Sequence, residues 1–281
     1  LTMALQRLDE LVIEFDRPMR KATKDGAKSD ALDAIRAARE ALGRDKLNQP
    51  RANDGIREAI RVHTVARAAA VRARTAAVNE LKAFIVTADE QLRSELRGLR
   101  TNKIVIRCSR FRDSAKRPVD ERCTRNAMRA LARRVQHLEA EIAEHDAAMK
   151  TLIDRAAPQL IAERGVGYVT AAAFYLAWSH PGRCHSEAAY ARLGGTAPVE
   201  VTSGQNQDRH RLNRGGDRQL NRALYFVAVT RQRCCPETKD YMARRTSEGK
   251  TEREATRCLK RFIARRVWRL LEHPELHLDK T

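Results

Sequence analysis

The chain has 281 residues, 42% of them hydrophobic, and a formal net charge of +19, so it can bury a core beneath a strongly basic surface. Aromatic residues make up only 5%, which argues against OB-fold or RRM platforms that stack single-stranded bases on aromatic rings. Nucleic acid is the expected partner, because each phosphate neutralised by the protein releases counterions. A surface that is merely solvated is the alternative.

The six cysteines do not suggest a metal site. None belongs to a Cys-x-x-Cys pair, so we do not expect zinc. The sequence shows neither a signal-peptide pattern nor an apolar run of membrane length. We therefore expect reduced thiols, a cytoplasmic location and no membrane partner.

The first 50 residues predict a strand followed by a helix. ELVIEFDRP (Glu10 to Pro18) has the β-prone composition of a strand ended by proline. SDALDAIRAAREALGRDK predicts a helix with Ser29 as its N-cap and Gly43 as its stop. Asp30 and Asp33 would share one face of this helix and could hold a divalent metal for phosphodiester cleavage. An exposed acid pair favoured by the helix dipole is the simpler explanation of the same spacing.

The middle of the chain predicts two long helices. An Ala- and Arg-rich helical pattern runs from Asp54 to about Arg100, and residues 101–119 read as a basic break. The second helix has apolar residues at alternating steps of three and four, which is a heptad seam and predicts coiled-coil pairing: Met128, Leu131, Val135, Leu138, Ile142, Met149 and Leu152. His145 fills the one missing seam position, as a polar register-setting residue rather than as a ligand.

Residues 159–281 predict a separate, mostly helical unit after Pro158. GVGYVTAAA (Gly165 to Ala173) predicts a tight turn before a helix, similar to a helix-hairpin-helix element, whose amides bind DNA phosphate. Close packing between helices would require the same Gly165 and Gly167. Further helices are expected over about 218–233, 237–245 and 251–272, with a short strand at PVEVT.

The stretch VTSGQNQDRHRLNRGGDRQLNRAL (Val201 to Leu224) carries the second candidate for chemistry. Ser203 precedes Gly204 in an expected turn, and a serine hydroxyl attacks phosphate only with help from a base or cations. The neighbouring sequence supplies cations at Arg209, Arg211, Arg214, Arg218 and Arg222. Two glycines, Gly215 and Gly216, would let the backbone approach a phosphate. Ordinary turn chemistry explains an isolated Ser-Gly equally well.

Several segments occur in the order of one known family. VIEFDRP and KSDALDAIRAAREAL resemble the end of the RuvC-like DEDD domain of insertion-sequence transposases of the IS-one-ten class, also called bridge-RNA-guided recombinases. Residues 54–158 resemble the helical coiled-coil insert of that family. ERGVGYVTAAAFYLA, AAYARLGGTAPVEVTSG and RLNRGGDRQLNRALYFVAV resemble successive blocks of its C-terminal transposase domain. The shared order, over nearly the whole chain, makes the resemblance specific.

The resemblance implies a mainly α protein in three parts. These are a remnant of the RuvC-like α/β domain (1–53), a helical coiled-coil region (54–158) and a C-terminal serine transposase domain with a helix-hairpin-helix-like element (159–281). Asp30 and Asp33 match the third and fourth acids of the DEDD set, which bind Mg²⁺. Ser203 matches the serine nucleophile, which is thought to form a phosphoserine link to DNA.

The implied function is DNA strand cleavage and exchange during transposition, with a structured RNA that selects target and donor DNA. The family's active site is composite, so a homo-oligomer, either dimer or tetramer, is expected. The first Asp and the Glu of the DEDD set would precede the predicted strand, so we expect an N-terminally truncated or decayed copy. Glu10 and Glu14 are poor substitutes for those acids. Asp217 stands where the family commonly has Asn, and we expect it to serve as a helix N-cap, a role that either residue can fill.

Two other functions remain open from the residues alone. The same arginines and glycines would serve a nucleic-acid-binding protein without catalysis. The affinity of such a protein for nucleic acid would fall steeply as salt rises, and it would cleave no strand. The heptad seam would serve a coiled-coil assembly module, whose self-association Leu138→Lys would abolish.

Overall fold

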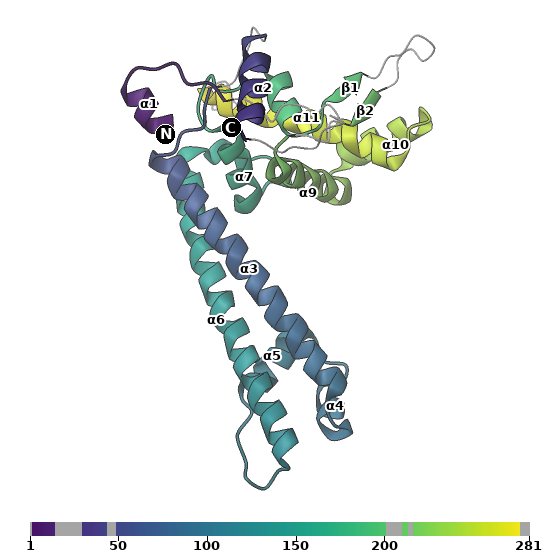
Figure 1. Ribbon diagram of the computed structural model, residues 1–281. Coiled ribbons are helices and arrows are strands. Elements are labelled where there is room, and N and C mark those ends of the chain that lie inside the picture. Colours follow the sequence, from purple (N-terminus) through teal and green to yellow (C-terminus); the bar gives the residue numbers. More distant parts are fainter. Residues whose placement is uncertain (1, 15–29, 44–48, 201–209, 213–215, 276–281) are drawn as a thin grey trace. The chain divides into compact units, whose positions relative to one another are not determined.

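A computed structural model describes residues 2–14, 30–43, 49–200, 210–212 and 216–275 (Figure 1). The described residues are mainly helical, as predicted, and include one two-stranded antiparallel ladder. The chain divides into two compact units, one formed by Leu1–Ile60 with Leu152–Thr281 and the other by Arg61–Thr151. None of the helices in the described ranges combines the length and apolarity needed to cross a membrane.

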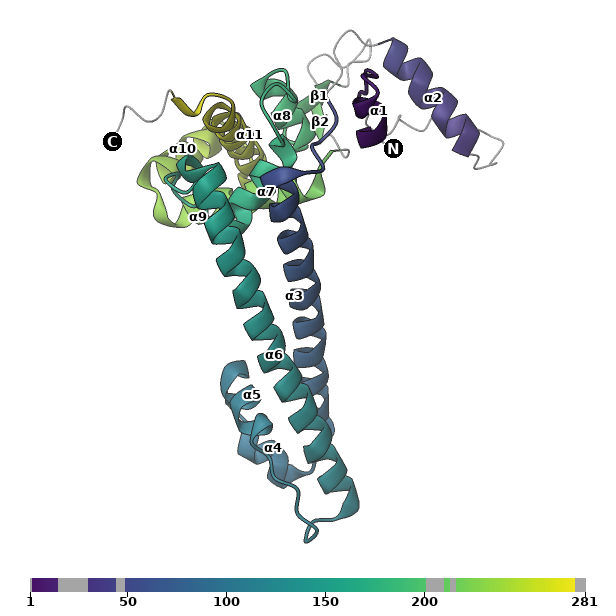
Figure 2. The ribbon, with the colours of Figure 1, turned by 90° about the vertical axis from the view of Figure 1, so that its left-hand side faces the viewer.

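The second unit contains most of two long helices that run antiparallel, α3 (Gly55–Thr87) and α6 (Val119–Ala156) (Figures 1 and 2). Arg67 of α3 pairs with Asp146 of α6 at 2.6 Å, and Arg74 pairs with Glu139 one to two turns further along. Residue numbers rise on one helix as they fall on the other, so the pairs fix an antiparallel register. The predicted pairing of two long helices is confirmed, and it occurs within one chain.

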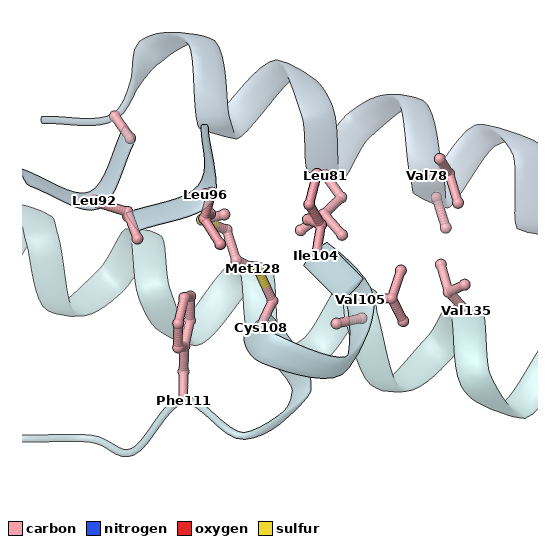
Figure 3. Packing of buried hydrophobic residues seen from close by; sticks show 13 residues of the cluster. Val78, Leu81, Leu92, Leu96, Ile104, Val105, Cys108, Phe111, Met128 and Val135 are labelled. Atoms are coloured by element: carbon pink, nitrogen blue, oxygen red, sulfur yellow. The ribbon is translucent and has the colours of Figure 1, made fainter. Parts of the chain in front are cut away.

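The heptad seam of α6 forms much of the core of this unit. Met128, Val135 and Leu138 are buried, as the spacing predicted. Figure 3 shows Val135 opposite Val78 of α3, and Met128 beside Leu96 and Cys108 of the same cluster. Because α3 covers this seam, the seam gives no separate argument for self-association, and the oligomeric state stays a prediction.

Two parts of this unit differ from the prediction. The helical pattern predicted from Asp54 to about Arg100 is divided, because α3 ends at Thr87 and a separate short helix follows. The sequence predicts a basic break over residues 101–119, but Thr101–Ser109 form helix α5, preceded by α4 (Glu90–Leu96). Ile104, Val105 and Cys108 lie on one face of α5 and are buried in the core (Figure 3). The apolar spacing stabilises a helix here, while the intervening Lys103 and Arg107 stay outside.

His145 meets a second histidine across the helix pair. The Nδ1 atoms of His145 and His63 lie 3.1 Å apart, and the rings pack edge to face. The described residues contain no group of three or more His, Cys, Asp or Glu side chains placed to hold a metal ion. The contact with His63 places His145 in the seam between the two helices, where the spacing predicted it.

The C-terminal part of the first unit is a bundle built around α11 (Glu252–Glu272). This helix packs against α7 (Tyr168–Trp178), α8 (Glu187–Leu193), α9 (Arg218–Cys234), α10 (Pro236–Ser247) and the short 3₁₀ turn η1 (Pro158–Leu160). The expected helices of this region are all present. The expected short strand is β1 (Pro198–Glu200), which pairs with β2 (His210–Leu212).

The N-terminal segment contains the predicted helix but not the predicted strand. Helix α2 (Asp30–Leu42) ends just before Gly43, as expected, and α1 (Thr2–Arg7) was not predicted. Within Glu10 to Glu14 the structure has only an isolated bridge at Glu14, so the strand prediction is wrong there, and residues 15–18 lie outside the described part. A strand persists only when a neighbouring backbone completes its hydrogen bonds. The one ladder in the described residues joins β1 to β2, and Leu11 is 91% exposed.

Candidate nucleic-acid interface

The Gly-Val-Gly turn before α7 is held by packing against α9. Gly165 has φ of +81°, and a Cβ there would lie 3.3 Å from the Cγ of Arg231 and 3.4 Å from a methyl group of Thr230. Val166 between the two glycines is buried. Glycine at 165 is thus required both by its backbone conformation and by a close neighbour.

Backbone groups at both ends of this turn also form hydrogen bonds within the chain. The Gly167 amide donates to the Thr170 hydroxyl, which donates to the Gly167 carbonyl. Arg231 donates to the Arg164 carbonyl at 2.7 Å and pairs with Glu163 at 3.0 Å. The packing explanation accounts for the turn, and DNA-phosphate binding by Gly165 and Gly167 stays a prediction.

Helix α9 starts at a tight contact with the end of α8. Gly216 has φ of +102°, and a Cβ there would lie 2.4 Å from the Leu193 carbonyl oxygen. The Asp217 amide donates to that same oxygen at 2.7 Å. Asp217 caps α9 by accepting from the Gln219 and Leu220 amides, which confirms its predicted N-cap role. Close approach to Leu193 therefore explains Gly216 without a phosphate.

A half-buried lysine supports the same corner. The Lys260 ammonium of α11 donates to the Asn221 side chain at 2.7 Å, and Asn221 donates to the Gly194 carbonyl at 2.6 Å. Burial, with a smaller effect from nearby Arg257, lowers the pKa of Lys260. Lys260, Asn221 and Gly216 together fix the start of α9 on the α8 turn.

The residues around the proposed nucleophile are described only in part. Ser203, Arg209 and Arg214 lie outside the described residues. Arg211 belongs to β2, where its backbone pairs with Val199. Arg218 and Arg222 are exposed on α9, and their binding of DNA phosphate stays a prediction.

The proposed metal ligands lie on one helix. Asp30 is the exposed first residue of α2, and Asp33 follows three positions later in the same helix. Mg²⁺ is commonly held by one or two carboxylates together with substrate phosphates and water. The Asp33 side chain lies outside the described part of the chain, so Mg²⁺ binding by Asp30 and Asp33 stays a prediction.

Glu14 has a structural role that the sequence did not reveal. Its carboxylate accepts from Arg183 at 2.7 Å, and Arg51 lies 3.6 Å from its other oxygen. Arg51 also pairs with Asp217 at 3.3 Å, so it links Glu14 to the N-cap of α9. The Arg183 side chain is only 1% exposed, and Glu14 neutralises its charge. These ion pairs occupy Glu14, which agrees with its exclusion as a metal ligand.

An aromatic pair on α9 was also missed by sequence reasoning. Tyr225 and Phe226 are 50% and 48% exposed, and the Arg222 guanidinium lies 5.4 Å from the Phe226 ring centroid. The low aromatic content concealed this pair, since composition says nothing about where rings gather. The spacing of Arg222, Tyr225 and Phe226 at i, i+3 and i+4 was the available signal.

Comparison with known proteins gives three matches. Residues 159–243 match the model of the Transposase IS116/IS110/IS902 family. The chain is 30% identical over 155 residues to the "Insertion element IS900 uncharacterized 42 kDa protein" of Mycobacterium paratuberculosis, covering 54% of this chain and 39% of that protein. It is 32% identical over 98 residues to the "Insertion element IS110 uncharacterized 43.6 kDa protein" of Streptomyces coelicolor, covering 35% and 24%. The aligned region thus spans well under two thirds of either relative, and both similarities are distant.

Proposed function

We propose, from the match of residues 159–243 to the Transposase IS116/IS110/IS902 family, that the chain cuts and rejoins DNA strands when an insertion sequence moves. The family match is the observation that carries this proposal. The matched region includes β1, β2 and α9. Ser203 and the five arginines proposed to bind DNA all fall within it. The net charge of +19 supports DNA as the substrate.

Ser203 is the proposed nucleophile. Its hydroxyl oxygen would form a bond to a DNA phosphorus while the bond to one sugar oxygen breaks, leaving a phosphoserine link and a free hydroxyl. Arg218 and Arg222 would bind backbone phosphates near the reacting strand, and Arg209, Arg211 and Arg214 would contribute positive charge to the charged transition state. The link conserves the phosphodiester energy, so that a second strand end can displace the serine.

Asp30 and Asp33 are the proposed ligands of Mg²⁺. When bound, the ion would supply positive charge to the phosphate under attack. The two carboxylates would hold the ion only in part and would leave positions for phosphate oxygens, as Mg²⁺ sites in nucleic-acid enzymes commonly do. A structured RNA that selects the DNA sites, and a homo-oligomer that assembles the acids with the serine domain, complete the proposal on the strength of the family resemblance.

The test is to trap the covalent link. The chain, expressed from its own gene, is incubated with DNA carrying the element's ends, the structured RNA of the element and Mg²⁺, and denaturing gels then reveal protein-bound DNA. We expect an adduct in the wild type and in Ser247→Ala, a control at an exposed serine of α10, and no adduct in Ser203→Ala. An adduct that persists in Ser203→Ala would show that the nucleophile is another residue.

The same assay addresses the metal site and the second function. Asp30→Asn and Asp33→Asn should abolish cleavage, while Asp240→Asn, at an exposed position of α10, should not. Nucleic-acid binding without any adduct, at every Mg²⁺ concentration, would instead identify a binding protein that lacks catalysis. The exposed arginines and aromatic rings of α9 are the observation that favours this second candidate.

A further inference from the structure

Helix α9 presents a stripe of basic and aromatic side chains to solvent. At 100° per residue, its members fall within about 100° of one another around the helix. Five are exposed: Arg218, Arg222, Tyr225, Phe226 and Arg233. The opposite face, which includes Leu220, Leu224 and Val227, is buried. We call these five residues the α9 stripe, and it extends for about 22 Å at 1.5 Å per residue.

The charges of the α9 stripe differ from those of four other arginines in this bundle. Arg231, Arg265, Arg266 and Arg269 are engaged by Glu163 or Glu187. Within the described part of the chain, no carboxylate pairs with Arg218, Arg222 or Arg233. The stripe itself contains no acid, so its positive charge is directed at solvent and at any anion that approaches.

The two rings of the stripe are placed to contact flat ligands. The ring centroids of Tyr225 and Phe226 lie 6.2 Å apart with planes tilted by 56°, so the rings do not cover each other face to face. Arg222 lies over the Phe226 ring. About half of each aromatic side chain is exposed, although burying a ring is favourable. Rings kept in water between arginines are typical of surfaces that stack bases and bind the adjoining phosphates.

We propose that the α9 stripe binds unpaired nucleotides, with bases stacked on Tyr225 and Phe226 and phosphates held by the three arginines. Duplex DNA fits less well, because its bases are already stacked and hide their faces. A second copy of this chain also fits less well, since one stripe laid on another would bring six arginines together without an acid. The inference rests on the proposed function only in taking nucleic acid as the partner, and it specifies a single-stranded segment, of DNA or of RNA.

The experiment compares stacking with charge by fluorescence anisotropy. The probes are a labelled 15-nucleotide dT strand, the corresponding rU strand and a 15-base-pair duplex. Tyr225→Leu/Phe226→Leu keeps apolar volume but removes the aromatic faces, and Arg218→Ala/Arg222→Ala removes two charges. Phe262→Leu is the matched control, because Phe262 is a 56% exposed aromatic residue of α11 outside the stripe.

We expect the double leucine variant to bind single strands roughly 10- to 100-fold more weakly and the duplex almost normally. The dependence of its single-strand affinity on salt should not change. The double alanine variant should lose affinity for every probe, and its salt slope on single strands should fall by about 0.7 for each phosphate that an arginine no longer neutralises. Phe262→Leu should behave as wild type. The tighter of dT and rU identifies whether the bound strand is DNA or RNA.

Three results would overturn the inference. Unchanged single-strand binding in the double leucine variant would show that the rings do not stack bases. An equal loss for single strand and duplex would show a general effect on the surface. Loss of self-association, measured by light scattering, with unchanged nucleic-acid binding would make the stripe a contact between copies. If the wild type bound none of the probes, the proposed function would be contradicted as well. If the wild type bound duplex and formed the adduct, and the double leucine variant bound single strands equally well, only the inference about the stripe would be overturned.

Discussion

Gly216 is the residue on which the start of α9 depends most directly. Its φ of +102° is strained for any other residue, and a Cβ would lie 2.4 Å from the Leu193 carbonyl oxygen. The glycine therefore allows the start of α9 to lie against the end of α8. The cost of a side chain here combines backbone strain with a clash against backbone, which cannot rotate away.

Gly216→Ala should lower the free energy of unfolding by about 3 kcal/mol or more. Gly249 offers a matched control, because its φ is +86° but nothing lies within 4 Å of a Cβ built there. Gly249→Ala should cost only about 1 kcal/mol from backbone strain. Urea denaturation of both variants measures the difference, and equal losses would mean that Leu193 moves to accommodate the methyl group.

Cys108 predicts a pH dependence of stability at the residue scale. Burial raises the pKa of the Cys108 thiol from 9.0 to about 11, so the folded state retains its proton over a range where the unfolded state releases it. The contribution of the Cys108 thiol to the free energy of unfolding is therefore fully present below pH 9. As the pH rises toward 11, the free energy of unfolding falls by at most about 2 kcal/mol through this group. Cys108→Ala should lose this part of the pH dependence.

Melting temperatures between pH 8 and 11 provide the measurement. The wild type should lose more stability over this range than Cys108→Ala, although the variant is less stable at pH 8 because of the missing sulfur. Tyrosines and the other thiols titrate in both proteins and cancel in the comparison. Parallel curves for the two proteins would contradict a protonated, buried Cys108.

The antiparallel pair α3 and α6 is the element whose stability comes most clearly from its seam. Leu81 is 1% exposed and lies in the cluster with Met128 and Val135 (Figure 3). The ion pairs Arg67–Asp146 and Arg74–Glu139 lie at partly exposed positions, where such pairs contribute up to about 1 kcal/mol each. Apolar burial thus stabilises the pair, while the charges select its register.

Leu81→Ala should destabilise the second unit by about 2–5 kcal/mol, because it removes buried methyl groups and leaves a cavity. Val86 on the same helix is 71% exposed, so Val86→Ala should change stability by about 0.5 kcal/mol or less. Helical circular dichroism during urea denaturation distinguishes the two variants. A small effect of Leu81→Ala would mean that the seam can collapse around the missing side chain.

At the scale of the whole molecule, the net charge governs encounters with nucleic acid. If the surface neutralises six or more phosphates, the affinity for duplex DNA should fall by about 1,000-fold or more between 50 and 200 mM salt. Anisotropy titrations in KCl would give the slope directly. A flat salt dependence would indicate a basic surface that is solvated rather than bound to phosphate.

The sequence by itself determined the main helices, because each has its own periodic apolar face and its own start and stop signals. The spacing of Met128, Val135 and Leu138 predicted a buried seam, and Asp217 predicted a helix N-cap, since both patterns act over a few residues. The order of blocks resembling a known family predicted the transposase domain that residues 159–243 match. The site residues Ser203, Asp30 and Asp33 stay predictions of that resemblance.

Tertiary structure decided what depends on partners distant in sequence. Whether Leu11 to Glu14 form a strand depends on a neighbouring backbone, and α5 depends on a core that covers Ile104 and Cys108. The pairing of Glu14 with Arg183 joins residues 169 positions apart, and no local pattern encodes it. Likewise, the rings of the α9 stripe are exposed only because the opposite face of α9 packs on α11 and α7. Local periodicity fixes which face of a helix is apolar, but only the packed chain determines which side chains remain in water.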